Sequence, residues 1–278
     1  MSSLIMSCVD DNEIVSTDIL EKDVSSEMSQ FGLKIGNTIF SPVDTTGNII
    51  HVCMPQNLEL KNVRASFETD KSIDVFVNGI NQISELTEND YTDIKNGVLF
   101  CVADENGNAK EYIVKAINSD LPVIFVTTPN CQPIVDKENW IGESKIKIWE
   151  PSRGITYSST TKIKGRGNYT WTYPKKPYAL KLDKKEALLG LSCHKRFCLL
   201  ACWKGYIGNY YMAEVAKRCV GNPWVSKGKF VELIVNGEFL GLYYLSEQIK
   251  VDKNRVNIAE LKPDDLGGKF NRGIFDRI

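Results

Sequence analysis

The sequence lacks several features that would assign it to a well-defined class. It has no run of about 18 apolar residues, so no segment could cross a bilayer as a helix. It has only two histidines, His51 and His194, and its eight cysteines include no Cys-x-x-Cys pair. Zinc sites usually carry closely spaced paired ligands, and a catalytic cysteine needs a partner histidine in a recognisable motif. Metal binding and cysteine catalysis are therefore not predicted.

A strong net charge is also lacking, but the value of −1 hides an asymmetry. Residues 1–120 carry 20 acidic and 8 basic side chains, whereas residues 121–278 carry 15 acidic and 26 basic ones. An acidic half joined to a basic half indicates a boundary near residue 120. The basic half could attract phosphate groups or an anionic surface, or it could simply be a solvated face. Because no nucleic-acid-binding fold signature accompanies it, nucleic acid is not predicted as a partner.

The N-terminus resembles the end of a bacterial lipoprotein signal. "LIMSC" is followed by "VDD", which makes Cys8 the residue expected to carry lipid. The charged start and the full apolar core of a signal are missing, so either the start is assigned too far downstream or the resemblance is chance. Residues 9–30 are acidic and Ser-rich, as in a flexible tether. We therefore expect residues 1–30 to be a signal remnant and tether. The protein would be an exported, outer-membrane or cell-surface lipoprotein that contacts membrane only through its lipid anchor.

Residues 31–118 are predicted to be all-β. Two apolar, β-branched runs flank "DENGNAK" within residues 97–117, which is typical of a hairpin. Several short strands with regular turn signals predict a β-sandwich of immunoglobulin-like size. This segment resembles the immunoglobulin-like modules that precede other domains in surface lipoproteins of Bacteroides-type bacteria.

Residues 121–278 are predicted to form a second, α+β domain with an antiparallel sheet and packed helices. Alternation within residues 176–185 places Tyr178, Leu180 and Leu182 on one strand face. Two apolar strands surround Asn236-Gly237, so residues 229–249 form the clearest hairpin. A helix over residues 206–219 is predicted to pack through side chains at i+4 steps, namely Ile207, Tyr211, Val215 and Cys219.

The stretch "KIKGRGNYTW" (residues 162–171) raises the main functional question. Gly165 and Gly167 permit backbone conformations and close approaches that a Cβ would obstruct. A strand that ends in such a loop can direct N–H groups at an anion, and Arg166 adds donors suited to phosphate oxygens. Alternatively, the loop is a tight turn behind which Trp171 is buried. A lone Gly-x-Gly does not decide between a phosphate loop and a turn.

Motifs in the second domain resemble those of the CotH family, an atypical kinase-like group named for spore coat protein H. "IKGRGNYTW", "PKKPYALKLDKK", "LLGL" and "VELIVNGEFLGLYYLSEQIKVDKNRV" occur in the family's order and spacing. The resemblance covers about residues 121–258. It implies ATP-dependent phosphorylation of protein Ser or Thr by a diverged kinase fold, with ATP and Mg²⁺ as cofactors.

The resemblance also implies a set of nucleotide-binding residues. The Gly165–Gly167 loop would lie near the phosphates, and Lys181 would contact them from its strand, as the strand lysine of ordinary kinases does. Glu247 would be an ion-pair partner for a basic residue of the site, or else a solvated carboxylate at a strand end. The complete implied set is Lys164, Gly165, Arg166, Gly167, Lys176, Lys181 and Glu247.

The sequence departs from the family at its C-terminal end. Phosphoryl transfer needs carboxylates for the attacking hydroxyl and for Mg²⁺, and in the family these follow the Asn-Gly-Glu hairpin. Asp264, Asp265 and Asp276 are present but lie in no matching motif. We therefore predict a C-terminally incomplete member, either truncated or retained as a scaffold, with little or no kinase activity.

Two further expectations follow from this departure. The alternative function is a non-catalytic cell-surface module that binds an anionic ligand, a glycan or a partner protein. A domain without its C-terminal strands would expose a sheet edge, which predicts a homodimer through the hairpin at residues 229–249.

Overall fold

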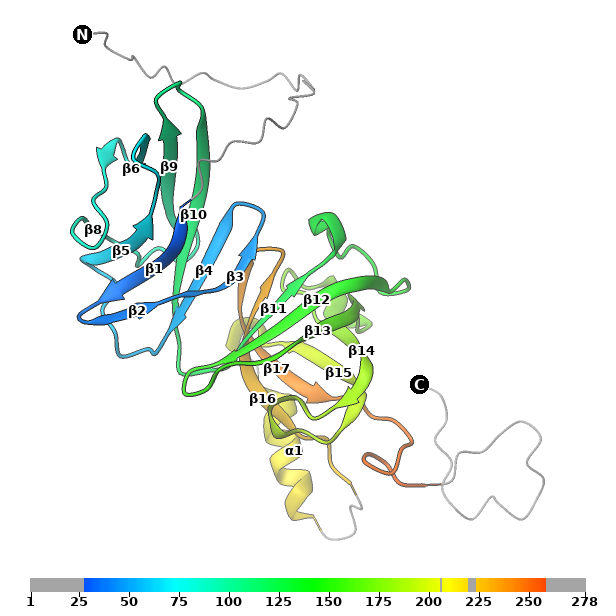
Figure 1. Ribbon diagram of the computed structural model, residues 1–278. Coiled ribbons are helices and arrows are strands. Elements are labelled where there is room, and N and C mark those ends of the chain that lie inside the picture. The colour runs from blue at the N-terminus through cyan, green and yellow to red at the C-terminus, as the bar shows by residue number, and fades with distance from the viewer. Residues whose placement is uncertain (1–27, 206, 220–223, 259–278) are drawn as a thin grey trace, which may run out of the picture.

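The structure is a computed structural model that describes residues 28–205, 207–219 and 224–258 (Figure 1). The described chain is mostly β. Cys8, most of the expected tether and the three C-terminal aspartates lie outside the described residues. No helix in the described part is long and apolar enough to span a membrane.

The N-terminal unit consists of two sheets that share one hydrophobic core. The first has the strand order β2-β1-β5-β8 and the second β3-β4-β10-β9-β6-β7. Phe31 and Phe100, from different sheets, meet edge to face with ring centroids 5.7 Å apart. The expected hairpin is β9–β10. The strands are β1 (Ser29–Ile35), β2 (Thr38–Phe40), β3 (Pro42–Thr46), β4 (Ile49–Met54), β5 (Val63–Glu68), β6 (Ile73–Val77), β7 (Ile80–Asn81), β8 (Glu88–Asn89), β9 (Val98–Asp104) and β10 (Ala109–Asn118).

The second unit is a closed barrel, where an antiparallel sheet was expected. Its strand order is β11-β12-β13-β14-β15-β17-β16, and β16 pairs with β11 in parallel to close it. Tyr178, Leu180 and Leu182 point into the barrel core, as their alternation predicts. The strands are β11 (Val123–Thr127), β12 (Ile141–Glu150), β13 (Gly154–Gly165), β14 (Tyr178–Glu186), β15 (His194–Ala201), β16 (Gly228–Val235) and β17 (Glu238–Glu247). Short 3-10 turns are η1 (Pro129–Cys131), η2 (Tyr169–Thr172), η3 (Leu188–Gly190) and η4 (Trp203–Gly205).

Closure of the barrel removes the reason for expecting a dimer through the hairpin at residues 229–249. The hairpin β16–β17 turns at Asn236-Gly237, as predicted, but each of its strands has a second neighbour, β11 for β16 and β15 for β17. The unpaired edge on which the dimer prediction depended is therefore absent from this hairpin.

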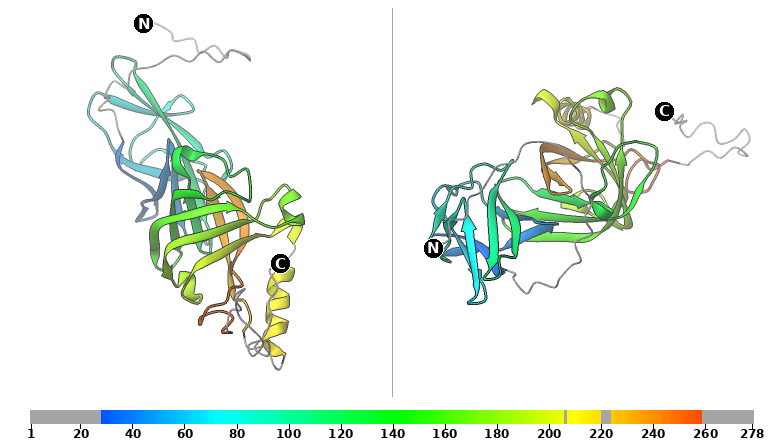
Figure 2. Two further views of the ribbon diagram at one scale, coloured as in Figure 1. Left: turned by 90° about the vertical axis from the view of Figure 1, so that its right-hand side faces the viewer. Right: turned by 90° about the horizontal axis from the view of Figure 1, so that it is seen from above.

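One α-helix, α1 (Gly208–Arg218), lies outside the barrel (Figures 1 and 2). Its position in the sequence agrees with the prediction, but the predicted packing face is wrong. Tyr211 and Val215 are 59% and 55% exposed, and no residue of the helix is fully buried. Tyr210 instead meets the barrel side chains Phe230 and Tyr244. The contact is decided by aromatic side chains on β16 and β17, which the helical period does not reveal.

The two units share a third hydrophobic cluster where β3 and β4 lie against β11 (Figure 1). A Cβ on Gly237 would lie 2.7 Å from Ile49 of the N-terminal unit, so the hairpin turn sits directly on β4. Lys147 of the barrel donates to the Val43 carbonyl and pairs with Asp44 at 3.1 Å. The cluster consists of Val43, Cys53, Ile117, Val123, Phe125, Trp149 and Ile234.

Candidate functional site

A cavity with a volume of about 960 Å³ lies on the outer surface of the barrel. The loop between β13 and β14, the ends of β15 and β17, and α1 surround it. This volume is at the upper end of the range for small-molecule and cofactor sites. Its lining combines the cations Arg166, Lys175 and Lys204 with the aromatics Tyr173, Trp203 and Tyr244. Its other polar side chains are the hydroxyls of Thr170, Ser226 and Ser246, the amides of Asn209 and Gln248, and the carboxylate of Glu247.

The glycine loop beside the cavity is built primarily for close packing. A Cβ on Gly165 would lie 2.4 Å from the Trp171 ring and 2.7 Å from the Asp136 carbonyl oxygen. Gly167 has φ +86°, and a Cβ there would lie 2.2 Å from the hydroxyl of Thr170. Trp171 is half-buried and packs on the barrel core. These contacts support the interpretation of a tight turn with a packed Trp.

The backbone donors of this loop are partly used within the protein. The N–H of Gly165 donates to the Asp136 carbonyl at 2.9 Å, and that of Arg166 donates to the Pro177 carbonyl at 3.1 Å. An anion beside the loop would therefore not find these two N–H groups free. The loop can offer the Arg166 side chain, which lines the cavity.

The structure separates the lysines that the sequence groups together. Lys164 donates to the Glu138 carbonyl at 3.1 Å and lies over the Trp140 ring. Lys176 donates to the Trp171 carbonyl at 2.8 Å. Neither lysine lines the cavity, and neither does Lys181, which faces outward on β14. Of the seven implied residues, the cavity lining brings together Arg166, Gly167 and Glu247.

Lys175 is the cavity lysine that the implied set omits. Its ammonium donates to the Leu242 carbonyl at 2.7 Å and lies 4.6 Å from the centre of the Tyr243 ring. Burial lowers its pKa. "PKKP" has no periodicity that distinguishes Lys175 from Lys176, so the sequence gives no signal for choosing between them.

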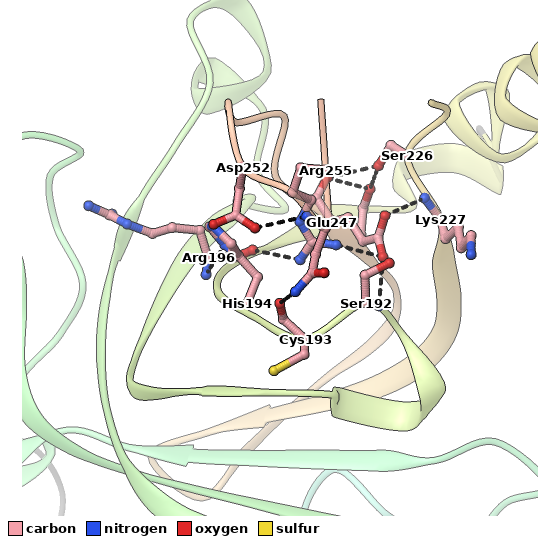
Figure 3. A network of polar contacts seen from close by, with 11 residues as sticks. Ser192, Cys193, His194, Arg196, Ser226, Lys227, Glu247, Asp252 and Arg255 are labelled. Carbon is pink, nitrogen blue, oxygen red and sulfur yellow. Dashed lines mark hydrogen bonds and ion pairs between the residues drawn. The ribbon is translucent and has the colours of Figure 1, made fainter. Parts of the chain in front are cut away.

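Glu247 is one of the residues that line the cavity, and it is ion-paired with a buried cation (Figure 3). Its carboxylate lies 2.6 Å from the Arg255 guanidinium, and neither side chain is exposed. It also accepts from the N–H of Ser192 at 2.8 Å and from that of Lys227 at 3.1 Å. Glu247 is thus an ion-pair partner of a basic residue, but that residue is Arg255 and none of the implied lysines.

Arg255 belongs to a segment that several polar contacts fix to the barrel (Figure 3). Asp252 pairs with Lys185 at 2.7 Å, and Asn254 donates to the Cys193 carbonyl at 3.0 Å. The hydrogen bond from Lys185 lowers the pKa of Asp252 to about 2. The Arg255 guanidinium also lies 5.3 Å from the centre of the Phe197 ring. Sequence reasoning missed Arg255, although "KVDKNRV" directly follows the predicted hairpin.

Metal-ligating side chains do not gather into a metal-binding cluster within the described part of the chain. Within residues 28–205, 207–219 and 224–258, no group of three or more His, Cys, Asp or Glu side chains could hold a metal ion. The cavity lining in this part of the chain contains one carboxylate, Glu247, which accepts from two backbone N–H groups and is ion-paired with Arg255. No reaction step is therefore derived through a metal.

Comparison with protein families agrees with the motif resemblance. Residues 163–271 match the CotH family, described as CotH kinase protein. The match begins in β13, includes every residue of the cavity lining and extends beyond the described part of the chain. A search of curated proteins found no match.

Proposed function

Since residues 163–271 carry a CotH domain, we propose that the cavity binds the phosphate groups of a nucleotide, with ATP as the family's ligand. The main support for this proposal is the positive charge of the side chains that line the cavity. Arg166, Lys175 and Lys204 face a space whose single described carboxylate is cancelled by Arg255. A cavity with excess positive charge and restricted solvent attracts a polyanion.

The remaining lining suits the rest of a nucleotide. Tyr173, Trp203 and Tyr244 provide aromatic surface on which a base can stack. The hydroxyl of Thr170 can donate to phosphate or ribose oxygens. The hydroxyls of Ser226 and Ser246 hydrogen-bond to the Glu247 carbonyl and to each other, and they can still accept from a ribose hydroxyl. The volume of about 960 Å³ accommodates a molecule of this size.

The proposal concerns binding and not transfer. Phosphoryl transfer needs a carboxylate that orients the attacking hydroxyl. In the described lining, Glu247 is held by Arg255, Ser192 and Lys227 and is not free for that task. Little or no kinase activity remains a prediction. Mg²⁺-dependent transfer from labelled ATP to the chain itself or to casein would refute it.

Calorimetric titration of ATP tests the binding site. We expect Arg166→Ala and Lys175→Met each to weaken binding at least about tenfold, the effect of losing a charge-assisted contact. Lys145→Ala removes an exposed cation from β12 and serves as the control. Lys181→Ala tests the residue that the family resemblance implies against the cavity, because Lys181 does not line it. If only Lys181→Ala abolishes binding, the cavity is not the phosphate site.

The same titration distinguishes the alternative function. A non-catalytic module would bind a glycan or a peptide and remain indifferent to Arg166→Ala and Lys175→Met. Undetectable ATP binding by the folded wild-type chain would favour that alternative.

The surface-lipoprotein assignment also remains a proposal. It rests on "LIMSC" with Cys8 and on the two-sheet N-terminal unit, whose shared core suits an immunoglobulin-like module. Labelled palmitate should be incorporated into the wild-type chain in a bacterial host, and Cys8→Ala should prevent it. If neither the wild-type chain nor Cys8→Ala incorporates labelled palmitate, the lipoprotein assignment is refuted.

A further inference from the structure

Three cations lie side by side across neighbouring strands of the barrel. Lys162 of β13 pairs in register with Lys181 of β14, and Lys181 pairs with Arg196 of β15. Neighbouring strands are about 4.8 Å apart, so the three positions span about 10 Å. We call Lys162, Lys181 and Arg196 the basic row. Like charges directly opposite one another destabilise a sheet, so the row carries an energetic cost.

The row lies on the outer face of the barrel. Lys162 is exposed and Lys181 and Arg196 are half-buried. Their neighbours along the strands point inward and are buried, as Ile163, Leu180 and Phe197 illustrate. The side chains of the row are therefore accessible to a partner.

No carboxylate within the described residues neutralises the row. The salt bridges of this part of the chain involve none of its three members. Asp183, two residues beyond Lys181, accepts a hydrogen bond from Thr160. Within the described residues, the row therefore has no ion-pair partner, in contrast to Arg255, which pairs with Glu247.

Trp140 holds one member of the row in place. The Arg196 guanidinium lies 4.7 Å from the centre of the Trp140 ring, and Lys164 lies 5.1 Å from it. Stacking on an aromatic ring fixes the plane of a guanidinium while its edge remains able to donate two parallel hydrogen bonds to a carboxylate.

We propose that the basic row is a docking surface for an extended acidic peptide segment of a partner protein. Side chains at i and i+2 of an extended chain are about 7 Å apart, so two successive carboxylates of this kind fall within the row's length of about 10 Å. The two carboxylates would lie between the three cations, and this contact would relieve the repulsion within the row.

A peptide fits better than a nucleic acid. Single-stranded nucleic acids are bound along a longer positive groove with a series of stacking aromatics, whereas the row is short and has one neighbouring tryptophan.

The test is fluorescence polarisation at low salt and without nucleotide, with labelled ten-residue Glu-Ser and Gln-Ser repeat peptides as probes. We expect the Glu-Ser peptide to bind and the Gln-Ser peptide to bind at least tenfold more weakly. The triple variant Lys162→Gln/Lys181→Gln/Arg196→Gln should lose at least tenfold of the affinity. A control triple in the N-terminal unit, Lys61→Gln/Lys71→Gln/Lys95→Gln, changes the net charge equally and should lose less than twofold.

Three outcomes would overturn the proposal: equal binding of both peptides, equal loss in both triples, or tighter binding of a ten-nucleotide single strand than of the Glu-Ser peptide. A melting temperature of the row variant within a few degrees of wild type confirms that it is folded. Because no nucleotide is present, failure of the ATP proposal would leave this result intact.

Discussion

The Glu247 carboxylate and the Arg255 guanidinium lie 2.6 Å apart, and neither side chain has any exposed surface. The pair connects the last barrel strand to the segment that follows it, and Glu247 also lines the cavity. A buried ion pair is costly to break because the remaining charge has no solvent and no partner.

Arg255→Met should therefore lower the free energy of unfolding by about 3–5 kcal/mol. Urea unfolding followed by tryptophan fluorescence measures the loss. Lys185→Met breaks the more exposed pair with Asp252 and should cost no more than about 1 kcal/mol. The double variant Glu247→Met/Arg255→Met should recover part of the loss, since it leaves no buried charge. Equal losses for Arg255→Met and Lys185→Met would contradict this account.

Gly165→Ala should destabilise the protein by about 1–3 kcal/mol, the usual range for overpacking. The added methyl would meet the Trp171 ring and the Asp136 carbonyl at less than 3 Å. Gly142→Ala is the matched control, because a Cβ there has open space and its φ is not positive. Thermal unfolding of both variants gives the comparison. A Gly165→Ala protein as stable as Gly142→Ala would show that the loop can open without cost.

The stability of the protein should fall as the pH drops from about 6.5 towards 4. His51 is fully buried beside Phe125, and burial lowers its pKa to about 4, with smaller effects from Asp44 and Lys115. Between these pH values the unfolded chain binds a proton that the folded chain does not. The free energy of unfolding therefore has its full value above pH 6.5. Near pH 4 it is lower by roughly 3 kcal/mol, at 1.36 kcal/mol per pKa unit.

His51→Leu should flatten this part of the pH profile. Urea midpoints at pH 7.5, 5.5 and 4.5 for wild type and variant measure it. His194 remains in both proteins, so the difference between the two profiles isolates His51. Parallel profiles would show that His51 takes up its proton without unfolding.

Phe125→Ala should weaken the docking between the two units. Phe125 is 1% exposed in the cluster that they share, and such truncations cost about 3–5 kcal/mol. All five tryptophans lie within residues 140–224, so fluorescence reports on the barrel while far-UV circular dichroism reports on both units. The two signals should coincide during unfolding of wild type and separate in the variant. Separate transitions already in wild type would show that the shared cluster does not couple the units.

Local patterns in the sequence predicted the elements well. The period-two pattern correctly placed Tyr178, Leu180 and Leu182 inside, and Asn236-Gly237 correctly marked a hairpin turn. The motifs around Gly165 correctly indicated the match to the CotH family over residues 163–271. Each of these signals acts between near neighbours in the chain and is therefore visible in a single sequence.

The positions of the charged side chains in space were not predictable in this way. Lys175 and Lys176 are adjacent, but only the loop conformation decides that Lys175 faces the cavity and Lys176 the Trp171 carbonyl. The exposed face of α1 was misjudged because the aromatic side chains of β16 and β17, remote in sequence, select Tyr210 as the contact.

The sequence alone determined strands, turns and the motifs of the CotH match over residues 163–271, because side-chain alternation, turn residues and short motifs are local properties. Only the tertiary structure decided that the sheet closes into a barrel, that Glu247 is neutralised by Arg255, and that Lys162, Lys181 and Arg196 form one row. Strand register and burial set these relationships, and both depend on contacts between segments far apart in the chain.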